Sequence, residues 1–353
     1  MSNTLRILAT LLPLCFLSAE PLANGGDTED QLDKWSGLDL DLARLGAALD
    51  VQDDAPRFSG YLSMFHADND DPDSTDIRQG FYINALRLTA DGGNSGYDWR
   101  ISIEANSDVP TLNDAYLRLP LFGDVTTTFG LFKKPVLQSG LIEANRTMFI
   151  TRSWNGLLYS VRDWGVMVSQ KKRHIELSCA VQDGADAGGD DALLTGRVDV
   201  DLIGDGRLEN EGAYGAGRNQ RLNASYAWSD DRASDRGRAR AFDFSFAHRR
   251  WSVAGEVVRY DSGYDDATGP FEGRSVGNTT PWSWTVGYML CTHCTELALR
   301  FEDLSDPVGE TQALLGLNYY VDGHDFKWQV NYAKHEDDYS ETDWLVVGLM
   351  LSF

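Results

Sequence analysis

Beyond its first 23 residues the sequence lacks any run of about 20 apolar residues, the length that a transmembrane helix requires. It is also short of positive charge, with 31 Lys and Arg against 54 Asp and Glu, so the formal net charge is −23. Such a chain would repel the phosphates of a nucleic acid. We therefore expect neither a helical membrane anchor nor a nucleic-acid partner.

Cysteine and histidine are scarce as well. Of four cysteines, Cys15 lies within the first 23 residues, Cys179 stands alone, and Cys291 and Cys294 flank His293 in the motif CTHC. This motif predicts a short turn, with a small disulfide or a weak metal site as alternatives, because two or three ligands do not close a zinc site. The six histidines show no spacing to serine or aspartate that would indicate catalysis. We expect no catalytic residue, no bound metal and no cofactor.

Residues 1–23 have the organisation of a secretory signal peptide. Arg6 provides a positive charge, residues 7–17 form an apolar stretch, and small residues follow. This order predicts cleavage at Ala19 or Ala23 and export of the mature chain.

Residues 24–57 differ from the rest of the chain, because their apolar side chains recur every three or four residues. This spacing predicts a short amphipathic helix or a periplasmic linker, with a trimerising coiled coil as the alternative. The apolar residues concerned are Trp35, Leu38, Leu42, Leu45 and Leu49.

From residue 58 to the end, segments of about ten residues alternate between apolar and polar side chains. Alternation with a period of two predicts strands, and ten residues suffice for a tilted strand to cross a bilayer. Roughly 16 such segments follow one another, which predicts a 16-stranded antiparallel transmembrane β-barrel over residues 58–353. The predicted strands are 58–68, 80–91, 97–107, 112–120, 125–134, 162–171, 173–183, 192–203, 219–229, 238–248, 251–260, 281–291, 295–304, 311–321, 324–335 and 343–353.

The connections between these segments fall into two classes. One class is short, as in QKKR (170–173), whereas the other is mostly longer and acidic, as in DNDDPDSTD (68–76) and HEDDYSETD (335–343). Short turns at one rim and long loops at the other are typical of outer-membrane barrels. The connection 204–220 is an exception, because it is long and falls at the short-turn rim.

The alternation also assigns the two faces of the sheet. In DFKWQVNYAK, Trp328 and Val330 oppose Lys327 and Gln329. We expect the apolar set to face lipid and the polar set to face a wet interior, the reverse of a soluble barrel. The last segment ends on Phe353, and we expect it to close the barrel, so that no backbone group is left unpaired in lipid.

The longest connection, residues 135–160, carries several apolar side chains, including Leu137, Phe149 and Trp154. Such a loop is expected to fold inward rather than to extend into water. A barrel of about 16 strands otherwise encloses an open aqueous channel, so an inward-folded third loop would narrow the bore.

Charged residues gather around this loop. Fixed charges select the sign of a permeating ion, and guanidinium groups suit phosphate and carboxylate oxygens. The basic residues therefore either bind permeating anions or pair with acidic neighbours to hold the wall rigid. The candidate pore residues are Arg87, Arg100, Arg118, Lys133, Lys134, Arg146, Arg152 and Arg162, with Glu104, Asp114 and Glu143 as acidic partners.

Several of these segments resemble the phosphate-selective porin O/P family. The likeness spans most of residues 58–353 and is strongest in 80–170 and 311–353. The matching motifs are DWRISIEAN, NDAYLRL, GLFKKP, the residue Glu143, TRSW and VRDWGV, followed near the end by LGLNYY, FKWQVNYAK and LMLSF.

The resemblance implies a trimeric porin of 16 strands whose inward loop carries anion-preferring lysines and arginines. By position, it implies that Lys133, Arg152 and Arg87 belong to this set. Two positions depart from the family pattern: Ala85 stands where the family has a further arginine, and Asn106 where it often has an acidic residue. The missing arginine weakens the expectation of high phosphate affinity.

We therefore expect a porin in the outer membrane of a Gram-negative bacterium, open to passive diffusion of small hydrophilic solutes and with a weak to moderate preference for anions such as phosphate. The first alternative is a general or cation-leaning porin governed by the acidic outer loops. A plugged structural or adhesive barrel and a membrane-embedded enzyme are further alternatives. The expected partners are outer-membrane lipid, lipopolysaccharide, small anions and two further copies in a homotrimer.

Overall fold

The computed structural model describes residues 55–69, 79–105, 110–184, 192–204, 206, 208–231, 237–261, 277–291, 293–306 and 309–353. The predicted signal peptide and nearly all of the predicted amphipathic segment 24–57 lie outside these residues. None of the helices that the structure describes is both long and apolar enough to span a membrane.

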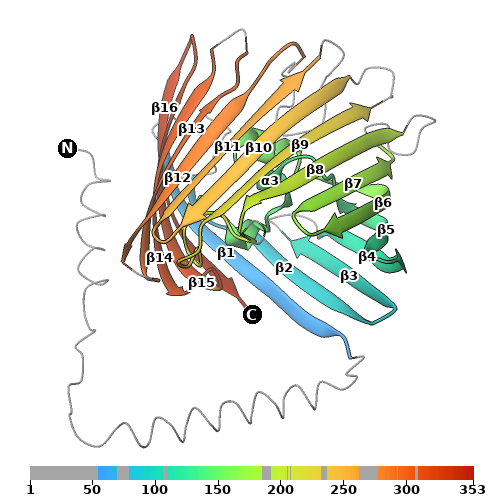
Figure 1. Ribbon diagram of the computed structural model, residues 1–353. Helices are drawn as coiled ribbons and strands as arrows, with labels where there is room; N and C mark the ends of the chain where they lie inside the picture. Colours follow the sequence, from blue (N-terminus) through green and yellow to red (C-terminus); the bar gives the residue numbers. More distant parts are fainter. Residues whose placement is uncertain are drawn as a thin grey trace, which may run out of the picture. The chain divides into compact units, whose positions relative to one another are not determined.

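Sixteen antiparallel strands form one closed barrel, as predicted (Figure 1). Every predicted strand is present, and the ends differ from the predictions by at most three residues. The strands are β1 (Arg57–Asn69), β2 (Gly80–Asn94), β3 (Tyr97–Ala105), β4 (Thr111–Phe122), β5 (Val125–Lys133), β6 (Arg162–Lys172), β7 (Ile175–Gln182), β8 (Leu193–Ile203), β9 (Arg221–Asp231), β10 (Arg238–His248), β11 (Trp251–Tyr260), β12 (Trp282–Cys291), β13 (Thr295–Asp303), β14 (Thr311–Asp322), β15 (Phe326–Glu336) and β16 (Glu341–Ser352).

The barrel closes where β1 pairs with β16. The register runs from Tyr61 opposite Ser352 to Asn69 opposite Trp344. Beyond the last paired residues, Gly60 and Phe353 exchange both backbone hydrogen bonds, at 2.9 and 3.0 Å. The terminal aromatic residue therefore completes the seam, as its position in the sequence predicts.

Side chains alternate between the two faces of the sheet as predicted. In β14, Leu315 and Leu317 are exposed on the outside, whereas Leu314 and Asn318 are buried inside. The interior also contains fully buried charged side chains, among them Lys327. An apolar exterior around a polar interior is the pattern of a barrel embedded in lipid.

The connections follow the predicted division between two rims, with a few differences. The β15–β16 connection is only Asp337–Ser340, because both strands extend further than predicted. In the β12–β13 turn, Cys291 and Cys294 form a disulfide, which selects one of the alternatives for the CTHC motif.

The β1–β16 seam depends on the absence of a side chain at Gly60. A β-carbon there would overlap the Arg87 carbonyl oxygen and lie 2.9 Å from Phe353 Cζ. We expect Gly60→Val to lower the free energy of unfolding by about 1–3 kcal/mol through overpacking. Urea unfolding in detergent micelles, followed by tryptophan fluorescence, measures this change. Leu62→Val on the same strand is the control, and an equal effect of both substitutions would contradict the role of the seam.

Candidate functional site

Loop 3, residues 134–161, crosses the interior of the barrel from β5 to the opposite wall. It contains α3 (Gln138–Leu141), the 3-10 turn η2 (Ala144–Arg146) and α4 (Trp154–Leu158). Backbone and side-chain groups of the loop bond to inward residues of distant strands: the Ile150 N–H donates to Asn331 Oδ1 at 2.8 Å, and Asn145 Nδ2 donates to Ser352 Oγ at 3.0 Å. The predicted inward fold of this loop is thus confirmed.

The apolar side chains of loop 3 explain why it folds inward. Leu137, Met148 and Phe149 are almost completely buried. Phe149 also lies beneath the guanidinium of Arg300, whose Cζ is 4.7 Å from the ring centroid. Burying each such side chain contributes about 1.5–3 kcal/mol relative to leaving it in water, so the loop is more stable against the wall than in solvent.

Inward carboxylates of the wall hold the loop in place. Glu256 of β11 accepts hydrogen bonds from Ser139 and Ser153 of the loop, both at 2.5 Å. Glu302 of β13 accepts the N–H of Trp154, the first residue of α4, at 2.7 Å. Sequence alternation places these carboxylates inside, but it does not indicate that their partner is loop 3.

A cavity of about 440 Å³ remains between loop 3 and the wall formed by β1–β4, the end of β16 and the β14–β15 turn. Its lining carries three arginines and four carboxylates, so both signs of charge face the same space. The charged lining residues are Arg87, Arg100, Arg146, Asp114, Glu143, Asp322 and Asp325.

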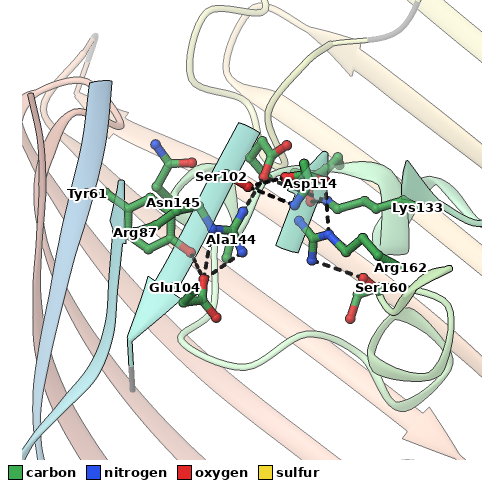
Figure 2. A network of polar contacts seen from close by, with 12 residues as sticks. Tyr61, Arg87, Ser102, Glu104, Asp114, Lys133, Ala144, Asn145, Ser160 and Arg162 are labelled. Atoms are coloured by element: carbon green, nitrogen blue, oxygen red, sulfur yellow. Dashed lines mark hydrogen bonds and ion pairs between the residues drawn. The ribbon is translucent and has the colours of Figure 1, made fainter. Parts of the chain in front are cut away.

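Arg87 lies at the centre of the polar network beside this cavity (Figure 2). Its guanidinium forms ion pairs with Glu104 at 2.6 Å and with Glu143 of loop 3 at 2.9 Å. The Tyr61 hydroxyl donates to the same Glu104 carboxylate at 3.0 Å, and the Tyr61 ring lies 5.2 Å from Arg87 Cζ. Arg87 therefore joins the wall to loop 3.

The other two arginines of this wall also form pairs. Arg100 lies 3.7 Å from Asp91 and 3.9 Å from Glu143, and it lines the cavity. Arg118 pairs with Asp98 at 3.5 Å but is absent from the cavity lining, and both side chains of that pair are well exposed. All three arginines thus pair with carboxylates, but of the predicted partners on the wall only Glu104 is found, beside Arg87, whereas Asp114 pairs with Arg162 instead.

The two adjacent lysines have different surroundings. Lys133 donates to the carbonyls of Leu141 and Ile142 at 3.0 and 2.9 Å, and it lies 3.8 Å from Glu143. Lys134, just after β5, lies 4.0 Å from Asp163. Lys133 therefore supports the base of loop 3, and neither lysine belongs to the cavity lining.

Two further arginines, one in loop 3 and one at the start of β6, form hydrogen bonds to the loop. Arg152 donates to the carbonyls of Ser139 and Ile142. Arg162 bonds to Asp114 at 3.2 Å and to the Ser160 carbonyl at 3.1 Å, and Figure 2 shows both contacts. Both guanidinium groups therefore brace the two ends of the loop.

Arg146 differs from the other basic residues of the set. It lines the cavity, and no ion pair joins it to any residue that the structure describes.

Its neighbour Glu143 is surrounded by positive charge: burial alone would raise the pKa of this carboxyl, but Lys133 and Arg87 lower it from 4.5 to about 2. Glu143 is therefore ionised at neutral pH and pairs with the arginine and lysine side chains around it.

Sequence reasoning missed several residues of the site. Tyr61, Asn145, Asp322 and Asp325 line the cavity without having been predicted to do so. Alternation along β1 could have indicated Tyr61, whereas Asp322 and Asp325 lie in and beside the tight DGH turn and carried no signal. Among the residues that the structure describes, no group of three or more His, Cys, Asp or Glu side chains could hold a metal ion.

Removing the guanidinium of Arg87 would leave Glu104 and Glu143 without their nearest cationic partner. We expect Arg87→Met to lower the free energy of unfolding by about 1–3 kcal/mol, the cost of an unmade hydrogen bond to a charged group. Arg118→Met is the matched control, because its exposed pair is worth at most about 1 kcal/mol. Urea unfolding in micelles compares the two, and a larger loss for Arg118→Met would contradict the assigned network.

The low pKa of Glu143 predicts a pH dependence. Because the pKa is below its value in the unfolded chain, the carboxylate stabilises the fold above pH 4.5, and this contribution is lost as the pH falls toward about 2. The difference in unfolding free energy between wild type and Glu143→Gln should be constant from pH 7 to 5 and should shrink below that. A difference that grows on acidification would refute the assignment.

Comparison with known proteins reveals similarity only at the level of structure: no protein-family model and no curated protein matches the chain. A double mutant of the Rhodopseudomonas blastica porin matches with a TM-score of 0.55 at 12% identity, over 85% of this chain and 100% of that chain. A triple mutant of the same porin matches with a TM-score of 0.53 over the same shares. A structure described as "Asymmetric conductivity of engineered proteins" matches with a TM-score of 0.54. The chain therefore has the fold of the R. blastica porin.

Proposed function

We propose that this protein is a porin, a water-filled channel through which small hydrophilic solutes diffuse passively across the outer membrane of a Gram-negative bacterium. The observation that carries the proposal is the charged cavity of about 440 Å³ between loop 3 and the barrel wall. A barrel whose outside is apolar and whose inside is polar suits a pore in lipid. The fold shared with a porin agrees with this assignment.

We further propose a weak preference for anions such as phosphate. Three cations of the wall, Arg87, Arg100 and Lys133, lie within 4 Å of the single carboxylate of Glu143 in loop 3. Arg146 adds a guanidinium that faces the cavity without an ion-pair partner among the described residues. Guanidinium groups recognise phosphate and carboxylate oxygens through paired hydrogen bonds.

The alternative is a general or cation-leaning porin, and one observation favours it. Asp322 and Asp325, in and beside the β14–β15 turn, bring the cavity lining to four carboxylates against three arginines. The chain as a whole is strongly acidic, with a net charge of −23. Neutralising acidic residues within 68–76 or 335–343 should change selectivity strongly only under this alternative.

Export through residues 1–23, contact with lipid and lipopolysaccharide, and assembly as a homotrimer are parts of the same proposal. They rest on the sequence and on its resemblance to a porin family. Cross-linking of the protein purified in mild detergent tests the trimer, and a species with the mass of one chain would overturn it.

Reversal potentials across planar bilayers in a KCl gradient test the channel and its selectivity together. We expect defined conductance steps and a potential whose sign indicates anion preference.

Arg146→Glu should weaken or invert this preference, because it replaces a cation on the cavity lining. Arg118→Glu makes the same change of charge outside the lining and should have a smaller effect. A clear cation preference of the wild type would overturn the anion proposal, and the absence of conductance would overturn the channel.

A further inference from the structure

The long connection between β8 and β9 enters the barrel instead of turning at its rim. Its residues 208–217 are named the β8–β9 clamp below. Ala213 and Ala216 of the clamp are buried, and the Ala213 N–H donates to Glu296 Oε1 of β13 at 2.6 Å. This connection, which is long although it lies at the rim of short turns, thus reaches the inner wall at β13.

Two reciprocal hydrogen bonds join the clamp to loop 3. The Glu211 N–H donates to the Arg146 carbonyl at 2.9 Å, and the Met148 N–H donates to Glu211 Oε2 at 2.8 Å. Between these two residues, the Thr147 carbonyl accepts a hydrogen bond from Lys327 Nζ of β15 at 2.6 Å. The clamp and the wall therefore hold three consecutive residues of loop 3.

The clamp is packed closely on both sides. Gly212 has a φ of +95°, and a β-carbon there would lie 2.7 Å from Glu296 Oε2 and 2.8 Å from Met148 Cγ. Tyr214 packs against Tyr320, with ring centroids 4.6 Å apart. Only glycine permits this conformation and this approach at position 212, so the clamp has little room to shift relative to loop 3.

The residue whose carbonyl the clamp holds is Arg146, the arginine of the cavity lining that forms no ion pair among the described residues. No ion pair with a described residue therefore positions this guanidinium, and its location depends on the backbone of loop 3. We propose that the β8–β9 clamp, through Glu211, positions Arg146 in the passage and thereby maintains the selectivity of the pore. Glu211 is a positioning residue in this scheme, and the effect on selectivity rests on the proposed channel function.

Thiol labelling tests the clamp without requiring conductance. Met148→Cys, introduced together with Cys179→Ala, places the only reduced cysteine of the mature chain at a buried position of loop 3 that the clamp covers. In detergent micelles, a charged methanethiosulfonate reagent should label it slowly. Adding Glu211→Ala should raise the labelling rate about fivefold, the change expected for one lost hydrogen bond.

Two control variants distinguish loss of the Met148–Glu211 hydrogen bond from loss of the negative charge of Glu211. Glu211→Gln retains an oxygen that can accept the Met148 N–H, so its labelling rate should stay near the reference. Glu209→Ala removes the same charge two residues away from an exposed position, and it should leave labelling unchanged. Equal labelling in Glu211→Ala and the reference, or fast labelling in Glu211→Gln, would overturn the clamp.

Bilayer recordings test the consequence for permeation. Glu211→Ala should reduce the shift in reversal potential that indicates anion preference and should increase open-channel noise, whereas Glu209→Ala should resemble the wild type. Unchanged selectivity in a conducting Glu211→Ala channel would overturn the link to Arg146. If labelling follows the expected pattern and no variant, wild type included, conducts, the clamp is supported and the proposed channel function fails.

Discussion

The pairing of β1 with β16 is the constraint on which the rest of this structure depends. A sheet surrounded by hydrocarbon has no water to satisfy the backbone groups at its edges, so only a closed sheet is stable there. The Gly60 and Phe353 backbones complete this closure at the end of the seam. Closure also creates an enclosed inner wall, and that wall provides the opposing surface on which loop 3 and the β8–β9 clamp pack.

Within the barrel, buried carboxylates bind loop 3 and the clamp. Glu256, Glu302 and Glu296 are each nine-tenths or more buried, a placement that is costly unless hydrogen bonds compensate. Glu256 and Glu302 receive such bonds from loop 3, and Glu296 receives them from the clamp and from the Tyr320 hydroxyl. The interior is therefore a polar core, in which hydrogen bonds to segments far apart in the chain replace contact with water.

The basic residues beside the cavity divide into two groups with different consequences. Arg87 and Arg162 are bound to carboxylates of the wall or the loop, so their charge is largely neutralised and their contribution is rigidity. Arg146 lines the cavity without such a pair among the described residues. Asp322 and Asp325 line the same cavity, so its surface carries carboxylates as well as this guanidinium.

The sequence alone determined the strands, their faces and the inward course of loop 3, because period-two alternation and the apolar residues of the loop are local properties. It also placed Arg87, Arg100 and Glu104 on the inner face. Only the tertiary structure decided which charges meet, since Arg87 and Glu143 are 56 residues apart and become neighbours through the path of loop 3. The β8–β9 clamp carried no periodic signal either. Its conformation depends on contacts with β13, β14 and loop 3, which exist only once the barrel has closed.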